Sequence, residues 1–343
     1  MRNPDDLLKT DSYDYTLPPG LIASEPAEPR DSARLMVINR ADGAVTHTRF
    51  REILNFLPPD YAVLYNDTKV IKARLFGAKT SGGRVELLIN RPLPNNRFDV
   101  LIRGRVRPDT RLVFGEGLEA VVLALHEDGH RVVRFENDGK TLGFDALLPF
   151  LERLGHVPLP PYIRREDRPE DARRYQPVFA QNAGAVAAPT ASLHFTPELF
   201  ARLRKRHEVQ PVTLHVGAGT FKPVESETIT DHPMHREYYE IPHAAQRLIE
   251  SDRPLLAIGT TVTRSVEYYV RTQKPIGECD LFLHPLNPPR RVNALLTNFH
   301  LPRSTLLMLV ASFLGLEKTK KVYNIAIQER YRFYSYGDAM LIL

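Results

Sequence analysis

The chain has 343 residues, of which 43% are hydrophobic and 25% are charged, and its formal net charge is +5. This composition is typical of an ordinary globular protein, and the length allows two domains or one domain with a large insertion. The single cysteine, Cys279, excludes an intramolecular disulfide and a cysteine-based metal cluster, which favours a reducing cytoplasmic compartment.

The sequence carries no membrane or export signal. The N-terminal stretch is polar and lacks the apolar segment of a signal peptide. The longest apolar run, Leu306 to Leu316, has 11 residues and includes a serine, so it is too short to span a bilayer. We therefore expect a cytoplasmic protein without a membrane partner.

The positive charge is concentrated at the C-terminal end. From Pro289 onward there are eight Lys or Arg residues against three acids, so this segment alone accounts for the net charge of +5. A basic end on a neutral body favours an anionic partner, of which nucleic acid is the commonest. A solvated helix face explains the charge equally well.

Near the N-terminus the pattern is that of an α/β fold. Leu35 to Asn39 predicts a short strand, and Tyr61 to Tyr65 is a continuous apolar run typical of a strand buried on both faces. Four polar residues follow, Asn66-Asp67-Thr68-Lys69. Because ligands of open α/β sheets bind at the carboxyl ends of strands, these four are candidates for a site.

Between about Ile71 and Asp145 short apolar runs recur at roughly ten-residue spacing, separated by turn clusters such as Ser81-Gly82-Gly83. No helical pattern lies between them. The spacing predicts an antiparallel barrel or sandwich inserted into the other fold. Within it Arg103, Arg105 and Arg107 would share one face if the segment were extended.

After Phe150 the α/β pattern returns, and its most distinctive stretch is Gln181 to Thr196. A run of small residues there is closed by Pro189-Thr190 and followed by His194. Small side chains allow close approach of a ligand, although a packing seam with a core histidine has the same pattern. Thr196-Pro197-Glu198 then predicts the start of a helix.

Two glycine-containing turns follow predicted strands. The strand Pro211–Val216 leads to Gly217-Ala218-Gly219-Thr220, which lacks the third glycine and the helix of a dinucleotide-binding motif. The strand Leu255–Ile258 leads to Gly259-Thr260-Thr261 and a helix, an arrangement that offers backbone donors to an anion. Each turn could equally be structural. Helices are also predicted from Ser304 and over about 321–331.

Four histidines lie near glycine or proline turns: His194, His215, His235 and His300. No pair of them has the helical spacing of metal ligands with an acid between them, so we expect no metal site. A general acid or base, or a residue that orients a ligand, is the favoured role for at least one of them.

Taken in order, these segments resemble one family, the S-adenosylmethionine:tRNA ribosyltransferase-isomerases of queuosine biosynthesis. The resemblance covers the chain almost from end to end. It rests on DYTLPPGLIA, RDSARLMV, NDTKVIKARL, GHVPLPPYI, RYQPVFA, GAVAAPTASLHFT, HVGAGTFKPV, MHREYYEI, GTTVTRSVE, LLTNFHLPRSTLLMLV and YRFYSYGDAMLI. Each motif is weak alone, and their common order makes the assignment specific.

The resemblance implies an activity and a fold. The ribosyl unit of S-adenosylmethionine would be transferred to 7-aminomethyl-7-deazaguanine at the wobble position of a tRNA with a GUN anticodon. Isomerisation would give epoxyqueuosine, adenine and methionine. S-adenosylmethionine is the co-substrate, and no other cofactor is expected. The implied fold is a three-layer α/β catalytic domain with a mixed sheet (residues 1–70 and 150–343) and an inserted antiparallel β-barrel domain (71–149). A monomer is expected.

This chemistry needs a base for a proton next to the sulfonium, an acid for adenine departure and a deprotonated amine. The acid/base or orienting candidates are His194, His215, His235 and Glu237. Candidates for binding the donor and the substrate are Asn66, Asp67, Thr68, Lys69, Arg74, Pro189, Thr190, Gly217, Gly219, Thr220, Gly259, Thr260, Thr261, Arg264, Asn298 and His300. The barrel arginines and the C-terminal lysines would be available to the anticodon stem-loop.

The chain departs from the family pattern at several positions: Lys72, Pro177, Ser192, the segment 284–289 and Asn293, which replaces a usual aspartate. The last two leave the geometry before Thr297 open. Two other functions fit parts of the pattern. One is a tRNA-binding protein without catalysis, and the other is an S-adenosylmethionine-dependent tRNA methyltransferase.

Overall fold

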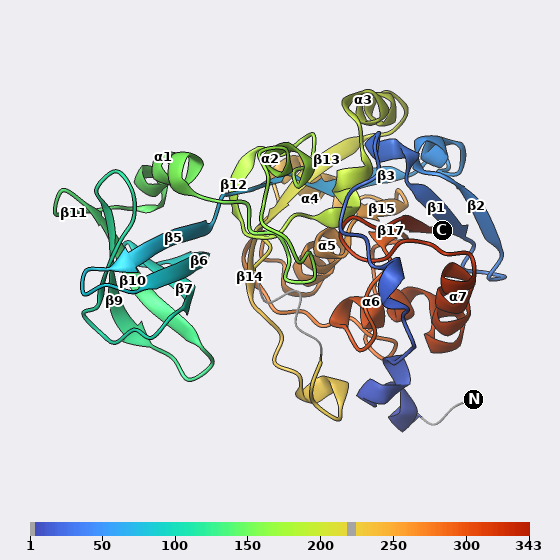
Figure 1. Ribbon diagram of the computed structural model, residues 1–343. Helices are drawn as coiled ribbons and strands as arrows, with labels where there is room; N and C mark the ends of the chain where they lie inside the picture. Colours follow the sequence, from blue (N-terminus) through green and yellow to red (C-terminus); the bar gives the residue numbers. More distant parts are fainter. Residues whose placement is uncertain (1–3, 218–223) are drawn as a thin grey trace. The chain divides into compact units, whose positions relative to one another are not determined.

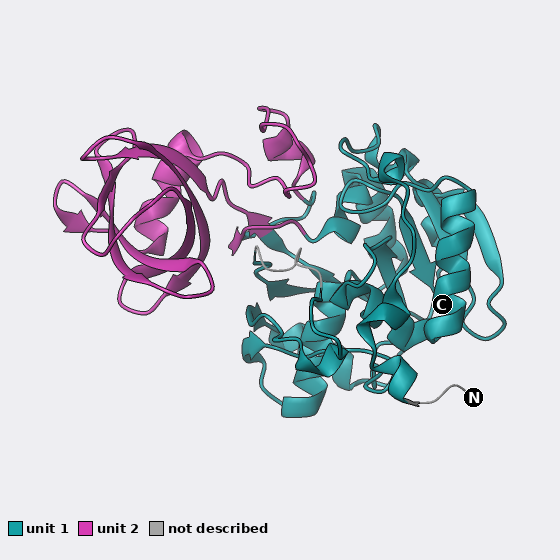
Figure 2. Ribbon diagram, turned by 60° about the horizontal axis from the view of Figure 1, so that its bottom comes forward, with its two compact units in different colours: residues 1–68, 177–182, 189–343 teal, residues 69–176, 183–188 magenta. Residues whose placement is uncertain are grey.

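The computed structural model describes residues 4–217 and 224–343, and its chain divides into two compact units (Figures 1 and 2). Unit 1 comprises residues 1–68, 177–182 and 189–343, and unit 2 comprises 69–176 and 183–188. Unit 2 therefore contains residues 69–70, 150–176 and 183–188 in addition to the inserted segment 71–149 expected from the sequence.

Unit 1 is built on a mixed nine-stranded sheet with the order β16-β14-β13-β3-β15-β17-β18-β1-β2. Its strands are β1 (Arg34–Ile38), β2 (Val45–Arg49), β3 (Ala62–Asn66), β13 (Val209–Leu214), β14 (Glu237–Glu240), β15 (Leu255–Ile258), β16 (Ile276–Cys279), β17 (Ala294–Asn298) and β18 (Ala339–Ile342). The central strands β13, β3, β15 and β17 run parallel to one another. Strands β3, β15 and β17 are buried at every position, because the sheet is covered on both faces.

The two faces of this sheet are covered by different helices (Figure 1). Alternate strand residues, among them Val63, Tyr65, Leu256 and Ile258, form one core with η5 (Phe50–Asn55), η6 (Thr190–His194) and α3 (Pro197–Arg206). Helix α5 (Thr260–Thr272) packs against β3, β13, β15 and β17. The layers confirm the predicted three-layer α/β fold.

Local signals fix several helix boundaries. The Thr196 hydroxyl accepts a hydrogen bond from Leu199 N and begins α3, as predicted, and the Ser304 hydroxyl caps α6 (Thr305–Leu314) through Leu307 N. The last helix, α7 (Leu316–Gln328), begins before the predicted Lys321, because Gly315 adopts a φ of 75° and lets the chain turn directly out of α6. The remaining helices are α1 (Phe144–Leu154), α2 (Asp171–Arg174) and α4 (His243–Glu250).

Unit 2 contains the inserted β-barrel. Its strands are β5 (Arg74–Lys79), β6 (Arg84–Leu93), β7 (Arg97–Arg103), β8 (Arg111–Val113), β9 (Leu118–Leu125), β10 (His130–Asn137) and β11 (Lys140–Thr141). The antiparallel order β10-β7-β6-β5-β8-β9 closes on itself through a pairing of β9 with β10, which Figure 2 shows as a ring of strands. Leu87, Phe98, Val100, Val122 and Phe135 are almost fully buried in this barrel. The predicted barrel is confirmed.

The expectation that three barrel arginines share one strand face is wrong. Strand β7 ends at Arg103, and Gly104 follows it with a φ of 131°, so Arg105 and Arg107 lie in a loop. The Arg103 guanidinium pairs with Glu86 at 3.3 Å. A two-stranded sheet of β4 (Thr68–Val70) and β12 (Asn182–Ala185) completes the strands.

Residues 290–292, which follow the segment 284–289 and precede β17, are held by a buried carboxylate. Glu267 of α5 is fully buried and accepts hydrogen bonds from the backbone N–H groups of Arg290, Arg291 and Val292 at 2.7–2.9 Å. The Arg271 guanidinium pairs with the Glu267 carboxylate at a nitrogen–oxygen distance of 2.5 Å. Glu267 thus fixes the backbone of residues 290–292, directly after the segment that departs from the family pattern.

Asn293 follows that loop and has a structural role. Its Oδ1 accepts a hydrogen bond from Leu255 N at 2.9 Å, at the start of β15. Asn293 lies at the amino ends of the parallel strands. The replacement of the usual aspartate by Asn293 therefore removes no side chain from the carboxyl ends, where the sequence predicts the site. Among the described residues, no helix is long and apolar enough to cross a membrane.

We predict that Glu267→Gln lowers the free energy of unfolding by about 3 kcal/mol, because it breaks a buried ion pair and turns an amide N–H toward backbone donors. Urea denaturation of the full chain measures the change. The matched control is Glu208→Gln, which removes an exposed ion pair with Arg253 and should cost less than about 1 kcal/mol. Equal losses in the two variants would contradict this role of Glu267.

Candidate active site

Four neighbouring parallel strands of unit 1 end at the same edge of the sheet, and each is followed by polar or glycine residues. We call these four segments the carboxyl edge: 66–68 at the end of β3, 215–217 after β13, 259–261 after β15 and 297–300 at the end of β17. Strand β3 lies between β13 and β15, so successive connections of the chain lead to opposite sides of β3. Ligands of open α/β sheets bind at such a point, where the strand order reverses direction.

Asn66 ends the pairing of β3 with β13. Its side chain is fully buried, donates to Leu214 O at 2.9 Å and accepts from Leu214 N at 3.1 Å. The same Oδ1 accepts from Thr68 N at 3.1 Å. Strand β13 therefore ends at Leu214 rather than at the predicted Val216, because an amide side chain takes over the backbone partners.

Asp67 is a buried carboxylate with both oxygens occupied. One oxygen accepts from the Thr213 hydroxyl at 2.6 Å, and the other accepts from the Asn182 amide at 3.0 Å. Its backbone carbonyl accepts from Gln181 N at 2.7 Å. Asp67 thus joins three chain segments, and its geometry is that of a positioning group.

His215 follows β13 and is hydrogen-bonded to Thr68, just after the end of β3. Its Nδ1 lies 2.8 Å from the Thr68 hydroxyl, and that hydroxyl donates to Asn182 O at 3.4 Å. The Thr68 hydroxyl holds the ring through Nδ1, and the direction of this hydrogen bond depends on the tautomer, because a hydroxyl can donate or accept. The ring stacks on Tyr238 with centroids 5.6 Å apart.

The pKa of His215 indicates that its ring is uncharged. Burial lowers this pKa, and the neighbouring charge of Asp67 opposes part of the shift. The half-buried ring is therefore neutral at pH 7, as a base requires.

Glu237 and Arg264 form a buried ion pair with a nitrogen–oxygen distance of 2.5 Å. The second Glu237 oxygen accepts from Gly217 N at 3.2 Å, and the guanidinium also donates to the carbonyls of Leu281 and Cys279. Burial alone would lower the pKa of Arg264, but the Glu237 charge outweighs it and raises the pKa. This geometry makes the pair a support for the Gly217 turn.

His194 lies in a packed region rather than in an open cradle. Its ring packs on the Phe50 ring, with centroids 4.9 Å apart, and the Asn298 side chain is its hydrogen-bonding neighbour. Burial lowers its pKa to about 4, against the opposing effects of Asp338 and Asn298. Ser192 is fully buried, so its hydroxyl points into the core.

His300 is buried and hydrogen-bonded within unit 1. Burial lowers its pKa to about 3, and its Nε2 bonds to the Thr297 hydroxyl at 2.9 Å. The Tyr323 hydroxyl accepts from His300 N at 3.1 Å, and the Tyr15 hydroxyl donates to His300 O. Beside it, the Asn298 amide donates to Tyr334 O at 2.9 Å.

The turn after β15 supplies donors to the carboxyl edge. Gly259 adopts a φ of 99°, which excludes most side chains and lets α5 begin at Thr260. The backbone N–H groups of this first turn point toward the edge. The buried Thr261 hydroxyl has no hydrogen-bond partner in the part of the chain that the structure describes.

Other predicted residues lie elsewhere. Lys69 and Arg74 belong to unit 2, where Lys69 pairs with Glu152 at 3.7 Å and Arg74 pairs with Glu86 at 3.4 Å. Pro189 and Thr190 form the start of η6, and His235 is exposed just before β14. Gly219 and Thr220 lie outside the described residues.

Three residues of this site were missed from the sequence: Asn182, Thr213 and Tyr238. Thr213 could have been found, because alternation along β13 places it on the same face as His215. Within the described ranges, no group of three His, Cys, Asp or Glu residues is arranged to hold a metal ion.

Comparisons with known proteins agree over the whole chain. A family described as "Queuosine biosynthesis protein" matches residues 10–342. The S-adenosylmethionine:tRNA ribosyltransferase-isomerase of Nitratiruptor sp. is 62% identical over 98% of this chain and 99% of the relative, and that of Aliarcobacter butzleri is 57% identical over the same shares. The crystal structure of S-adenosylmethionine tRNA ribosyltransferase from Thermotoga maritima is 36% identical, covers 97% of this chain and 100% of that chain, and has a TM-score of 0.55.

The burial of His194 predicts acid sensitivity. Because its folded pKa of about 4 lies below the ordinary value of 6.5, protons bind preferentially to the unfolded chain, and stability falls as the pH drops from 6.5 to 4. Between pH 6.5 and pH 4 the wild-type protein loses free energy of unfolding. We expect His194→Gln to reduce this loss by up to about 3 kcal/mol. Urea denaturation at pH 7 and pH 4.5 measures it. Replacing the exposed His243 by Gln should leave the dependence unchanged, and an unchanged dependence in His194→Gln would disprove the assignment.

Proposed function

The chain belongs to the S-adenosylmethionine:tRNA ribosyltransferase-isomerases of queuosine biosynthesis, and on this premise we propose that the carboxyl edge of unit 1 carries out their reaction. The ribosyl unit of S-adenosylmethionine is transferred to 7-aminomethyl-7-deazaguanine in tRNA and isomerised, which gives epoxyqueuosine-tRNA, adenine and methionine. S-adenosylmethionine is a co-substrate that is consumed, and tRNA is the acceptor.

The observation that carries the site assignment is the state of His215. The reaction needs a base that removes a proton from the carbon next to the sulfonium. His215 is a neutral imidazole held through Nδ1 by Thr68, and Nε2 is its basic atom in the tautomer with the proton on Nδ1. His194 and His300 are enclosed in the core, and Glu237 is bound to Arg264. We therefore assign the base to His215 and positioning roles to Thr68, Asp67 and Glu237.

The donor side of the site is proposed at the turn that begins α5. The buried Thr261 hydroxyl lacks a partner among the described residues. A hydroxyl suits the hydroxyl and amino groups of an adenosyl moiety. The finer expectations, a GUN anticodon, a cytoplasmic location, a monomer and no further cofactor, remain predictions.

Isotope transfer distinguishes this function from the two alternatives. With tRNA that carries the deazaguanine base and a donor labelled in the ribose, we expect label on tRNA and free adenine. Methyl label on tRNA would instead indicate a methyltransferase, and tRNA binding without transfer of either label would indicate a binding protein.

The role of His215 is tested in the same assay. We expect His215→Ala to lower kcat by about 10²–10⁴-fold, the usual contribution of a general base, with a smaller change in the KM for the donor. The exposed His243→Ala on α4 is the control and should turn over normally. Ordinary turnover by His215→Ala would move the base to another residue.

The pH dependence of kcat/KM gives an independent test. Because burial lowers the pKa of His215 below 6.5, the base form persists as the pH falls through 6.5 and is lost only at lower pH. We expect the acidic limb of the profile below pH 6.5. The residual activity of His215→Ala should lack that limb, whereas its persistence in the variant would contradict the assignment.

A further inference from the structure

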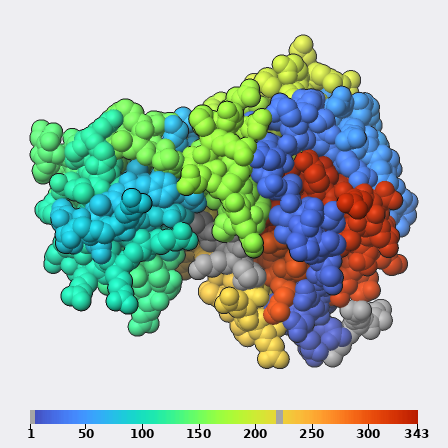
Figure 3. Space-filling model, in the orientation of Figure 1, coloured from blue at the N-terminus to red at the C-terminus, as the bar shows by residue number. Residues whose placement is uncertain are grey.

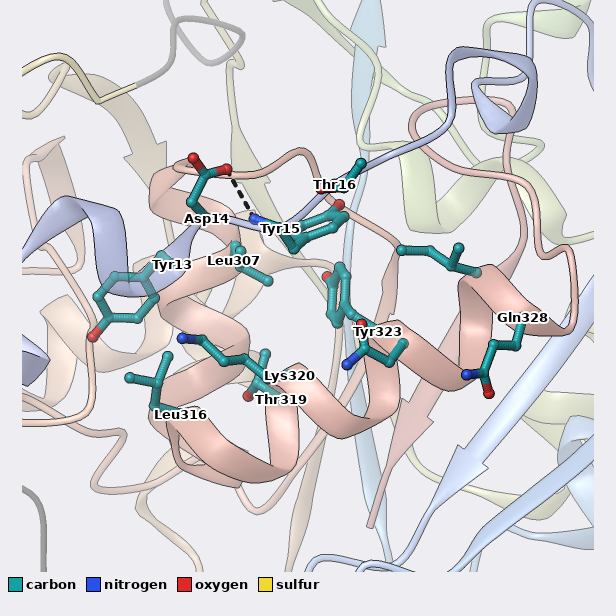
Figure 4. A pocket seen from close by; sticks show the side chains of 12 residues that line it. Tyr13, Asp14, Tyr15, Thr16, Leu307, Leu316, Thr319, Lys320, Tyr323 and Gln328 are labelled. Atoms are coloured by element: carbon teal, nitrogen blue, oxygen red, sulfur yellow. Dashed lines mark hydrogen bonds between the residues drawn. The ribbon is translucent and has the colours of Figure 1, made fainter.

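A pocket of about 400 Å³ opens between the N-terminal segment 13–16 and helices α6 and α7 of unit 1 (Figure 4). On the surface in Figure 3 these parts lie side by side, blue against red. The lining residues are Tyr13, Asp14, Tyr15, Thr16, Leu307, Leu316, Thr319, Lys320, Tyr323, Asn324, Ile327 and Gln328. None of the carboxyl-edge residues lines it, so it is a separate site.

The three tyrosines of the pocket form a fixed aromatic wall. Their hydroxyls are all engaged with backbone groups: Tyr13 donates to Leu7 O at 2.7 Å, Tyr15 donates to His300 O, and Tyr323 accepts from His300 N. The Tyr15 and Tyr323 rings meet edge to face with centroids 5.3 Å apart. Tyr15 is partly exposed, so its ring surface is available in the pocket.

The polar side of the pocket comes from one face of α7. Lys320, Asn324 and Gln328 are spaced four residues apart and therefore lie in one row along the helix. Lys320 is half-buried, and no ion pair or hydrogen bond joins it to another described residue. Its neighbour Lys318 differs, because its ammonium group donates to Arg40 O and Ala41 O.

This combination fits a nucleotide. An ammonium group binds a phosphate, side-chain amides pair with the edge of a base, and a tyrosine ring offers a stacking surface. The Asp14 carboxylate accepts from Tyr15 N at 2.8 Å, as the dashed line in Figure 4 marks, and its second oxygen can accept from a ribose hydroxyl. The pocket volume lies in the range of small-ligand sites.

We propose that this pocket binds one nucleotide of the tRNA substrate, different from the nucleotide that is modified. The proposal rests on the proposed function, since it takes tRNA as the acceptor. Tyr15 and Tyr323 both hold the backbone of His300 in the 297–300 turn, so a nucleotide in the pocket contacts the same residues that shape the carboxyl edge. Binding there would align the tRNA with the reacting site.

The test compares two adjacent lysines of α7. Lys320→Gln removes the charge in the pocket, and Lys321→Gln removes an exposed charge that does not line it. We expect Lys320→Gln to weaken tRNA binding about tenfold, the effect of losing one phosphate contact, and Lys321→Gln to change it less than twofold. Binding is measured without S-adenosylmethionine, and thermal unfolding checks that both variants fold. Equal effects of the two changes would overturn the proposal.

A second measurement separates the sources of the nucleotide. Nucleoside 5′-monophosphates are titrated into the wild-type protein and the Lys320→Gln variant, with and without tRNA. Binding that depends on Lys320 and is displaced by tRNA supports the proposal. Binding that tRNA leaves intact would assign the pocket to a free nucleotide instead, and binding of L-methionine with the same dependence on Lys320 would assign it to an amino acid.

The outcome is independent of catalysis. If ribose transfer fails while Lys320→Gln still weakens tRNA binding, the proposed function falls and the pocket assignment stands. If transfer succeeds while the two lysine variants bind tRNA equally, the pocket assignment falls alone.

Discussion

The hydrogen bonds of the buried Asp67 carboxylate determine the geometry of the carboxyl edge. A charge in this position is costly unless its oxygens are bonded, and the Thr213 hydroxyl and the Asn182 amide meet that demand. Because the two partners come from different segments, the chain must bring all three together to bury the charge. The same arrangement sets Thr68 beside His215, so the orientation of the imidazole follows from the burial of a neighbouring acid.

Helix α5 carries residues of two ion pairs that fix neighbouring segments of unit 1. Its Arg264 pairs with Glu237 and fixes the Gly217 turn, while its Glu267 pairs with Arg271 and fixes the loop before β17. The Arg264–Glu237 pair is buried, and Glu267 is buried while Arg271 is partly exposed. Each charged group has further hydrogen bonds that offset its loss of water. One helix thus connects the segments that follow β13 with the segment that precedes β17.

The sequence was sufficient where a signal is local. Thr196 and Ser304 are capping residues whose side chains bond three residues ahead, and the apolar runs of β3 and β15 require burial on both faces. The barrel could be predicted because its strands recur at regular spacing, and the family resemblance followed from the order of the motifs.

The roles of individual site residues could not be predicted in the same way. His194, His215 and His300 have similar neighbours in the sequence, and only burial and hydrogen bonding separate the two core residues from the candidate base. Glu237 pairs with Arg264, which lies 27 residues further along the chain, and no local sequence pattern predicts such a contact. The sequence left the effect of Asn293 open, because its hydrogen bond to Leu255 N at the amino end of β15 joins residues 38 positions apart.

The sheet of unit 1 ends in β2 on one side and in β16 on the other. Both outer strands are short, and they carry polar or charged residues, with sequences VTHTR and IGEC. Long apolar outer strands invite pairing between copies of a chain, and short polar ones oppose it. In unit 2 the barrel is closed, so its six strands leave no unpaired outer edge for another chain to pair with. Resistance to aggregation is therefore built into the two sheets by different means.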